Sequence, residues 1–172
     1  MFQVKTTAGA PKSVLYDELL AQVTGLLADE RDWLANTANV AALINQGLPG
    51  LNWAGFYFLR GGELVLGPFQ GKVACVRIAV GRGVCGTAAQ RRETVLVPDV
   101  EKFPGHIACD HASRSEIVLP LVKEGQLLGV LDLDSPHLAT FDETDAAGLQ
   151  HIVNVLLERT DFTAATSPGG QR

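Results

Sequence analysis

The segment from Cys109 to Asp134, CDHASRSEIVLPLVKEGQLLGVLDLD, contains the hairpin that decides the fold. Its two apolar runs, residues 117–122 and 127–133, are joined by Glu-Gly-Gln at 124–126. Apolar runs of this length on either side of a short glycine-containing turn are typical of paired antiparallel strands. The segment therefore predicts a β-hairpin, with a cysteine in the polar loop that leads into it.

Three acidic residues stand at unusual places in this hairpin. Glu116 precedes the first strand, and Asp132 and Asp134 interrupt the end of the second. Because successive strand side chains alternate between faces, Asp132 and Asp134 share one face. Solvated strand ends are the usual explanation of such acids, but packing alone favours Val or Thr there. Since converging carboxylates cannot all ionise easily, we expect at least one raised pKa, suited to a general acid.

The composition indicates a compact soluble protein. The chain has 172 residues, 47% of them hydrophobic, and a formal net charge of −5. This length fits one domain, and the acidic balance argues against nucleic acid or an anionic membrane as a main partner. No apolar run reaches the roughly 18 residues of a membrane span, and the N-terminus lacks the order of a secretory signal. Three cysteines do not make a disulfide framework, so we expect a reducing cytoplasm.

Periodicity along the rest of the chain predicts helices at both ends and strands between them. We expect an N-terminal arm at residues 1–11, one domain at 12–162 and a disordered tail at 163–172. The pattern predicts helices at 12–28, 30–45, 84–91 and from a capping box at 140–143 onward, and strands at 51–59, 63–66, 73–78 and 94–97 besides the hairpin. This order indicates an antiparallel sheet with packed helices, of the α+β class.

The strand at 51–59 adds two aromatic residues to the acidic face. Alternation puts Trp53 and Tyr57 on one face of this strand and three apolar side chains on the other. We expect the aromatic pair to lie with the acids, opposite the helical layer. Aromatic rings and carboxylates together can bind an ammonium group and an apolar chain.

The three cysteines differ in their surroundings. Cys109 lies among His, Asp and Arg residues in a loop, where nearby cations lower a thiol pKa and favour the nucleophilic thiolate. Cys75 lies in an apolar segment and taken alone is more often a small core residue. Cys85 opens a helix, whose positive end favours a thiolate, although packing is the commoner role. Because all three fall in segments expected around one pocket, we interpret them as a functional set.

A zinc site is the competing explanation for part of this set. His106, Cys109 and His111 are close in sequence, but their spacing matches no zinc knuckle, and the nearby carboxylates are harder ligands than structural zinc prefers. We therefore expect no metal and no cofactor. The GxGxxG at 81–86 lies outside any βαβ unit, so it predicts a strand-to-helix turn and not a dinucleotide site.

Together these residues resemble the free methionine-(R)-sulfoxide reductases, single-domain enzymes of the GAF fold. The resemblance covers nearly all of residues 12–160, and its cysteines and acids are much more specific than the fold. It is carried by NWAGFY at 52–57, GPFQG at 67–71, AC at 74–75, GVCGT at 83–87, PDV at 98–100, the segment from His106 to Glu116, and LDLDS at 131–135.

The resemblance implies a six-stranded antiparallel sheet with helices packed on one face, a ligand pocket on the other, and a homodimer built through the helices. It implies Cys109 as the nucleophile, Cys75 as the resolving cysteine that forms a disulfide with it, and Cys85 as a third thiol and alternative partner. The acids that bind the amino group and assist at the sulfoxide oxygen correspond to Glu116, Asp132 and Asp134, and the aromatic wall of the pocket to Trp53 and Tyr57. Of the three acids, we expect Glu116 or Asp134 to be the catalytic general acid.

The implied reaction is thiol-dependent reduction of free L-methionine (R)-S-oxide to L-methionine. A thiolate attacks sulfur while an acid protonates the departing oxygen. The resulting sulfenic acid condenses with a second cysteine, and thioredoxin reduces the disulfide. The alternatives are a non-catalytic GAF sensor module, which would not need three thiols, and a thiol peroxidase, which would not need the acids.

Overall fold

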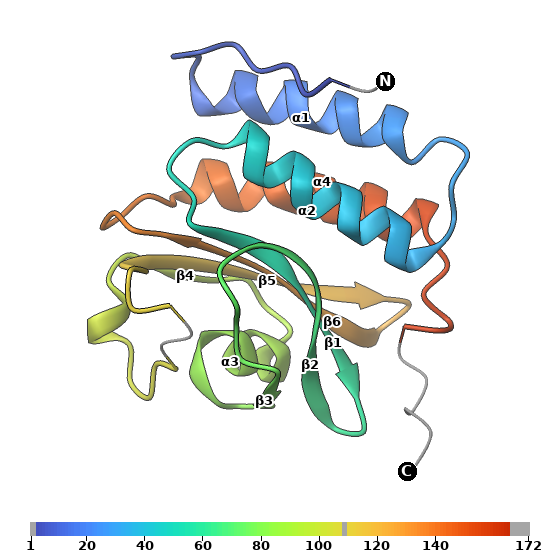
Figure 1. The fold of residues 1–172 in the computed structure, drawn as a ribbon. Coiled ribbons are helices and arrows are strands. Elements are labelled where there is room, and N and C mark those ends of the chain that lie inside the picture. Colours follow the sequence, from blue (N-terminus) through green and yellow to red (C-terminus); the bar gives the residue numbers. More distant parts are fainter. Residues whose placement is uncertain (1–2, 108–109, 166–172) are drawn as a thin grey trace.

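The structure is a computed structural model that describes residues 3–107 and 110–165. Along the chain, two helices come first, strands and short helices follow, and one long helix closes the fold (Figure 1). They are α1 (Lys12–Leu26), α2 (Trp33–Gly47), β1 (Trp53–Arg60), β2 (Glu63–Gly71), β3 (Arg77–Ala79), α3 (Gly83–Arg91), β4 (Val95–Val97), a 3-10 helix (Val100–Lys102), β5 (Ser115–Lys123), β6 (Gln126–Ser135) and α4 (Glu143–Arg159). Within the described ranges, none of the helices has the length and apolar character that crossing a membrane requires.

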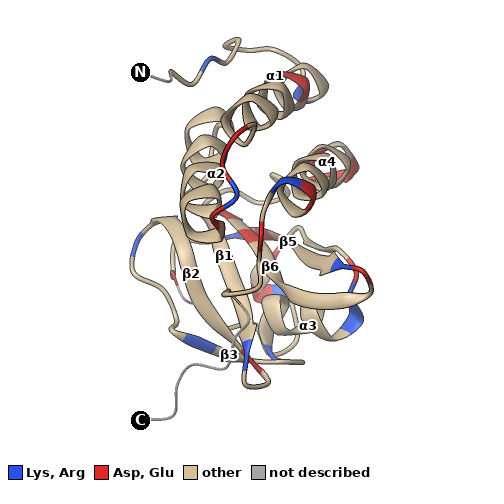
Figure 2. Cartoon of the chain, turned by 90° about the vertical axis from the view of Figure 1, so that its right-hand side faces the viewer, with Lys and Arg blue, Asp and Glu red and all other residues tan. Residues whose placement is uncertain are grey.

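The six strands form one sheet in the order β3-β2-β1-β6-β5-β4, and every neighbouring pair is antiparallel. Figure 1 shows α1, α2 and α4 stacked on one side of this sheet and α3 on the other. The predicted α+β architecture is therefore confirmed. In the side view of Figure 2, Lys and Arg are spread over loops and strand ends with Asp and Glu among them, so this view shows no continuous basic face.

Strand alternation divides the apolar side chains between two clusters. The larger cluster lies between the sheet and the three stacked helices, and it contains Phe56 and Phe58 of β1. The smaller one lies under α3 and contains Trp53 and Tyr57, the aromatic pair that alternation placed on the opposite face. This second cluster packs on the same face of the sheet as the three acids predicted from the sequence.

Several element boundaries differ from those expected from the sequence; β2, for example, continues to Gly71 where a strand at 63–66 was expected. The strand expected at 73–78 is reduced to Arg77–Ala79, so Cys75 lies in the loop between β2 and β3 and not in a strand. Helix α4 does start with a capping box, but its N-cap residue is Asp142. The Asp145 side chain accepts a hydrogen bond from the Asp142 backbone N–H and completes the box. The box is therefore displaced by two residues from the expected one at 140–143, because the Asp142 side chain, and not that of Thr140, accepts hydrogen bonds from the first free N–H groups of the helix.

The folded part of the chain reaches past the expected domain end at residue 162. Ala165 is fully buried and its carbonyl oxygen accepts a 2.6 Å hydrogen bond from Arg60 Nε. The described part of the expected tail therefore packs against β1, and the rest of the tail lies outside the described residues.

We predict that Gly55→Ala destabilises the protein by about 1–3 kcal/mol, the usual range for overpacking. A Cβ atom at Gly55 would lie 2.3 Å from Phe69 Cβ and 2.7 Å from Trp53 Cη2, inside the ring stack that Phe69 and Trp53 form. Urea unfolding measures the change. The matched control is Gly25→Ala in α1, where a Cβ atom meets nothing within 4 Å and replacing a helical glycine favours the fold. Equal stability of the Gly55→Ala and wild-type proteins would contradict a rigid aromatic stack.

Candidate active site

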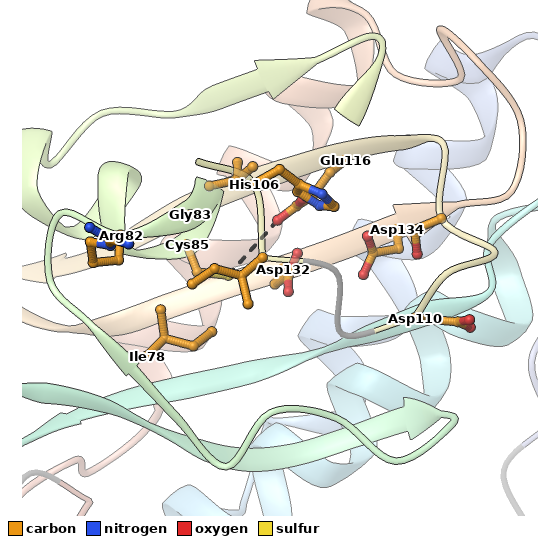
Figure 3. A pocket seen from close by; sticks show the side chains of 12 residues that line it. Ile78, Arg82, Gly83, Cys85, His106, Asp110, Glu116, Asp132 and Asp134 are labelled. Carbon is orange, nitrogen blue, oxygen red and sulfur yellow. Dashed lines mark hydrogen bonds and ion pairs between the residues drawn. The ribbon is translucent and has the colours of Figure 1, made fainter. Parts of the chain in front are cut away.

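A small cavity of about 30 Å³ lies on the sheet face that carries α3. Its walls come from the start of α3, the paired ends of β5 and β6, and the segment that joins β4 to β5 (Figure 3). The polar side chains that matter for its chemistry are Cys85, His106, Glu116, Asp132 and Asp134. The structure thus brings all three acids predicted from the sequence to one cavity, together with Cys85.

The strand register explains why the acids converge. Glu116 of β5 is paired with Asp134 of β6, and Asp132 lies two residues away on the same face. We name Glu116, Asp132 and Asp134 the acid cluster. Glu116 is the second residue of β5 and Asp134 the last but one of β6, so the backbone ladder still holds both residues at this end of the strands.

The acid cluster is buried. Glu116 and Asp132 are each 6% exposed, and Asp134 is half-buried. Burial is the first cause that raises the pKa of each carboxyl group well above its ordinary value. Repulsion among the neighbours adds to it: Asp134 acts on Glu116, Glu116 on Asp132, and Asp132 on Asp134. Both effects favour the protonated forms of these carboxyl groups, which is the direction that a general acid requires.

Two further groups contact Glu116 from opposite sides. Cys85 Sγ donates a long hydrogen bond of 4.0 Å to Glu116 Oε1, and His106 Nε2 lies 3.5 Å from Glu116 Oε2. Burial lowers the pKa of His106 and therefore favours its neutral ring. The sequence placed His106 in the loop, but gave no signal that it would reach an acid ten positions later.

Cys85 differs from the expectation for a thiol at a helix start. It is 4% exposed, and burial followed by the charges of Asp132 and Glu116 raises its thiol pKa well above the ordinary value. The helix end, which was expected to favour a thiolate, is outweighed by burial among acids. Cys85 is also a free cysteine in the structure. It therefore acts as a neutral thiol in the cavity wall.

A polar network that the sequence did not indicate supports Asp134. Asn52 Nδ2 donates to Asp110 Oδ2 at 3.2 Å and to Ser113 Oγ at 3.0 Å, and a hydrogen bond from the Ser113 side chain partly offsets the raised pKa of Asp134. Asn52 is 58 residues from Asp110 in sequence, so no local pattern could reveal the contact. The network holds the loop end against the start of β1.

The aromatic pair lies beside the cavity and outside its lining. Trp53 stacks on Tyr57 with ring centroids 5.9 Å apart and on Phe69 at 5.3 Å, and both members of the pair are at least 97% buried. The Tyr57 hydroxyl donates a 3.0 Å hydrogen bond to the Cys75 carbonyl oxygen. Burial, and next the charge of Asp132, raise the pKa of Tyr57. The pair therefore fixes the Cys75 loop to the acidic face.

The other two cysteines are described unequally. Cys75 is half-buried, packs against the smaller cluster and is disulfide-bonded. Cys109, the nucleophile implied by the resemblance, lies outside the described residues. The chain is anchored on either side of Cys109. The Val100 N–H donates a 3.0 Å hydrogen bond to the Arg114 carbonyl oxygen, and the Arg114 N–H donates a 2.7 Å hydrogen bond to the Ser135 carbonyl oxygen.

Comparison with known proteins places this geometry in a family. The GAF domain profile matches residues 3–156. The free methionine-R-sulfoxide reductase of Escherichia coli is 51% identical over 154 residues, which cover 88% of this chain and 93% of that protein. GAF domain-containing protein A of Dictyostelium discoideum is 53% identical, over 84% of this chain and 92% of its own. The Neisseria meningitidis free methionine-R-sulfoxide reductase, solved in complex with its substrate, superposes with a TM-score of 0.88 at 50% identity, over 92% of this chain and 95% of its own.

The raised carboxyl pKa values predict that stability falls as pH rises. Between the ordinary carboxyl pKa of about 4 and the raised values, the folded state binds more protons than the unfolded chain, so the free energy of unfolding decreases with pH. Asp132→Asn removes one of these protons and one repulsive charge, so the decrease from about pH 5 to about pH 8 should be smaller than in wild type. Urea unfolding across this range measures it. Asp29→Asn, at an exposed position, is the control and should keep the wild-type slope. A wild-type slope in Asp132→Asn would contradict the raised pKa.

Proposed function

This chain belongs to the free methionine-R-sulfoxide reductases of the GAF-domain family, and we propose that it reduces free L-methionine (R)-S-oxide to L-methionine with its own thiols. The observation that carries the proposal is the acid cluster, whose carboxyl groups have raised pKa values and line one cavity together with the Cys85 thiol. A passive GAF sensor has no need for a proton-holding acid next to a thiol, so the cluster favours the enzyme over that alternative.

The chemistry requires a thiolate and an acid at one sulfur atom. In the proposed first step the Cys109 thiolate supplies the electron pair, the sulfoxide S–O bond breaks, and the oxygen, protonated by the acid cluster, ends on Cys109 as a sulfenic acid. The substrate sulfur is reduced by two electrons and the cysteine is oxidised by two. Glu116 or Asp134 was expected from the sequence to be the general acid; within the acid cluster, the deeper burial of Glu116 and Asp132 favours these two to hold the proton that is transferred.

Recycling needs a second cysteine and an external dithiol. We assign the resolving role to Cys75, whose thiol attacks the sulfenic acid, forms the disulfide and releases water. Its half-buried position and its disulfide-bonded state support this assignment, whereas Cys85 is buried, free and holds its proton strongly. Thioredoxin in a reducing cytoplasm is the proposed reductant, because dithiol exchange restores both thiols.

Selection of the free amino acid follows from the charge and size of the cavity. The α-ammonium of the substrate can bind among the carboxyl groups, with Asp134 the most accessible of the three. A cavity of about 30 Å³ holds one or two water molecules and is too small for an amino acid. The proposed binding step therefore includes a rearrangement of the cavity lining that makes room for the amino acid.

The domain limits and the assembly are proposals of the same kind. We propose one catalytic GAF domain that begins at Lys12, preceded by an arm, and a homodimer built through the helical layer. Val14 of α1 and Leu34 of α2 are exposed apolar side chains on that layer, 41% and 52% accessible, and support such an interface.

The proposed function predicts selective turnover of one substrate. With thioredoxin as reductant, the protein should consume the R epimer of free methionine sulfoxide and leave the S epimer and peptide-bound methionine sulfoxide unchanged. Chromatography of methionine formed from each substrate measures this selectivity. Equal turnover of the peptide-bound substrate would contradict the closed amino-acid site, and no turnover of the free R epimer would contradict the function.

The cysteine variants serve as controls of the same assay. Cys109→Ser should abolish methionine formation, because the nucleophile is lost. Cys75→Ser should form methionine in a single turnover but not with thioredoxin, because no disulfide is made. Thioredoxin-dependent turnover by Cys75→Ser would transfer the resolving role to Cys85.

A further inference from the structure

A buried set of metal-ligand atoms lies inside the candidate active site. Cys85 Sγ and one carboxylate oxygen each from Glu116 and Asp132 all lie within 4.8 Å of one another, and all three side chains are buried. Figure 3 shows them projecting toward the same space from α3, β5 and β6. We name Cys85, Glu116 and Asp132 the three-ligand set. It is distinct from the zinc arrangement considered from the sequence, which used the loop residues His106, Cys109 and His111.

The set has an unused acceptor. Asp132 Oδ1 is buried and has no hydrogen-bond partner within the described parts of the chain, although Asp132 is only 6% exposed. A buried oxygen without a hydrogen-bond partner is unfavourable, so a cation or a hydrogen-bond donor in the cavity would be stabilised there. The cavity of about 30 Å³ beside it has room for one ion and little else.

The three-ligand set offers a metal ion one sulfur and two oxygen atoms, and zinc accepts both kinds of ligand in proteins. We propose that Cys85, Glu116 and Asp132 form a Zn²⁺ site that blocks substrate access to the cavity. A tetrahedral Zn²⁺ with bonds of about 2.3 Å to sulfur and about 2.0 Å to oxygen places the sulfur and oxygen ligand atoms about 3.5 Å from each other. Cys85 Sγ and Glu116 Oε1 are 4.0 Å apart, so a small side-chain adjustment closes the site. Three protein ligands leave the fourth position to water.

The surrounding residues favour zinc over other common cations. A thiolate ligand selects Zn²⁺ against Mg²⁺ and Ca²⁺, which prefer oxygen ligands alone. His106 Nε2 lies 3.5 Å from Glu116 Oε2, the oxygen that does not face Cys85, and can therefore orient the ligating carboxylate as an outer partner. On binding, the dication displaces the thiol proton and the cluster protons to solvent. The ion would thus occupy the position proposed for the substrate ammonium group, and it would also displace the proton that the general acid must donate.

Binding by the set can be measured without activity. The test uses the full-length Cys75→Ser/Cys109→Ser protein, in which Cys85 is the one remaining thiol. Titration with Co²⁺ should give a thiolate-to-cobalt charge-transfer band and the visible bands of a tetrahedral site, and Zn²⁺ should remove both. Adding Cys85→Ser should abolish the charge-transfer band, and adding Glu116→Gln instead should weaken Co²⁺ binding at least tenfold.

Controls separate this site from adventitious binding. His111→Ala removes an exposed loop histidine outside the set and should leave the Co²⁺ titration unchanged. Circular dichroism tests whether each variant is folded. If the variant with Cys85→Ser is unfolded, the variant with Glu116→Gln decides the outcome. Absence of the charge-transfer band in the double variant, or an unchanged titration in Glu116→Gln, overturns the proposal.

The inhibitory consequence rests on the proposed function, and the binding itself does not. In single turnover with pre-reduced wild-type enzyme, free of added thiols, Zn²⁺ should suppress methionine release, and a chelator should restore it. If the protein binds Co²⁺ but does not reduce methionine sulfoxide, the metal site is supported and the proposed function is contradicted. Methionine release that continues at saturating Zn²⁺ would contradict the block.

Discussion

The free energy of ionising three carboxyl groups on one buried sheet face is the constraint on which the site depends. Each unit by which a pKa rises corresponds to about 1.4 kcal/mol that the charged form has lost relative to water. Glu116, Asp132 and Asp134 can avoid this loss only by retaining protons or by binding a cation. Both outcomes are useful in a reductase, because the proton serves the leaving oxygen and the ammonium of an amino acid is a cation.

The fold maintains this unfavourable arrangement through its layers. The helices α1, α2 and α4 cover one face of the sheet with the larger apolar cluster, which supplies most of the buried hydrophobic area. The other face is covered by α3 and the aromatic stack, which exclude water from the acids. Backbone pairing of β5 with β6 then fixes Glu116 opposite Asp134, so the carboxyl groups cannot move apart without loss of the ladder.

Sequence alternation was sufficient to predict which residues share the acidic face. Period-two patterns in β1 and β6 assigned Trp53, Tyr57, Asp132 and Asp134 to one side, and the structure has them there. The pattern could not predict how deeply each side chain is buried, because burial depends on α3 and on the loop packed above the sheet. Trp53 and Tyr57 therefore lie beside the lining of the cavity, whereas the resemblance implied that they form the aromatic wall of the pocket.

Local rules failed where a tertiary environment outweighed them. The helix end at Cys85 predicted a favoured thiolate, but burial next to two acids has the opposite and larger effect on the thiol pKa. The contacts of Asn52 with Asp110 and Ser113, and of His106 with Glu116, join segments that no periodicity relates. The role of Cys109 remains a proposal from the resemblance.

The most direct test of the account is the chemical step in acid variants. Methionine release in a single turnover by pre-reduced enzyme, at saturating substrate, isolates sulfoxide reduction from recycling. An acid that only binds the ammonium affects KM, whereas an acid that protonates the oxygen affects the rate of the step itself. The account predicts that at least one of Glu116→Gln, Asp132→Asn and Asp134→Asn lowers this rate by about 10²–10⁴-fold while the fold remains intact. Wild-type single-turnover rates in all three variants would contradict acid-assisted reduction.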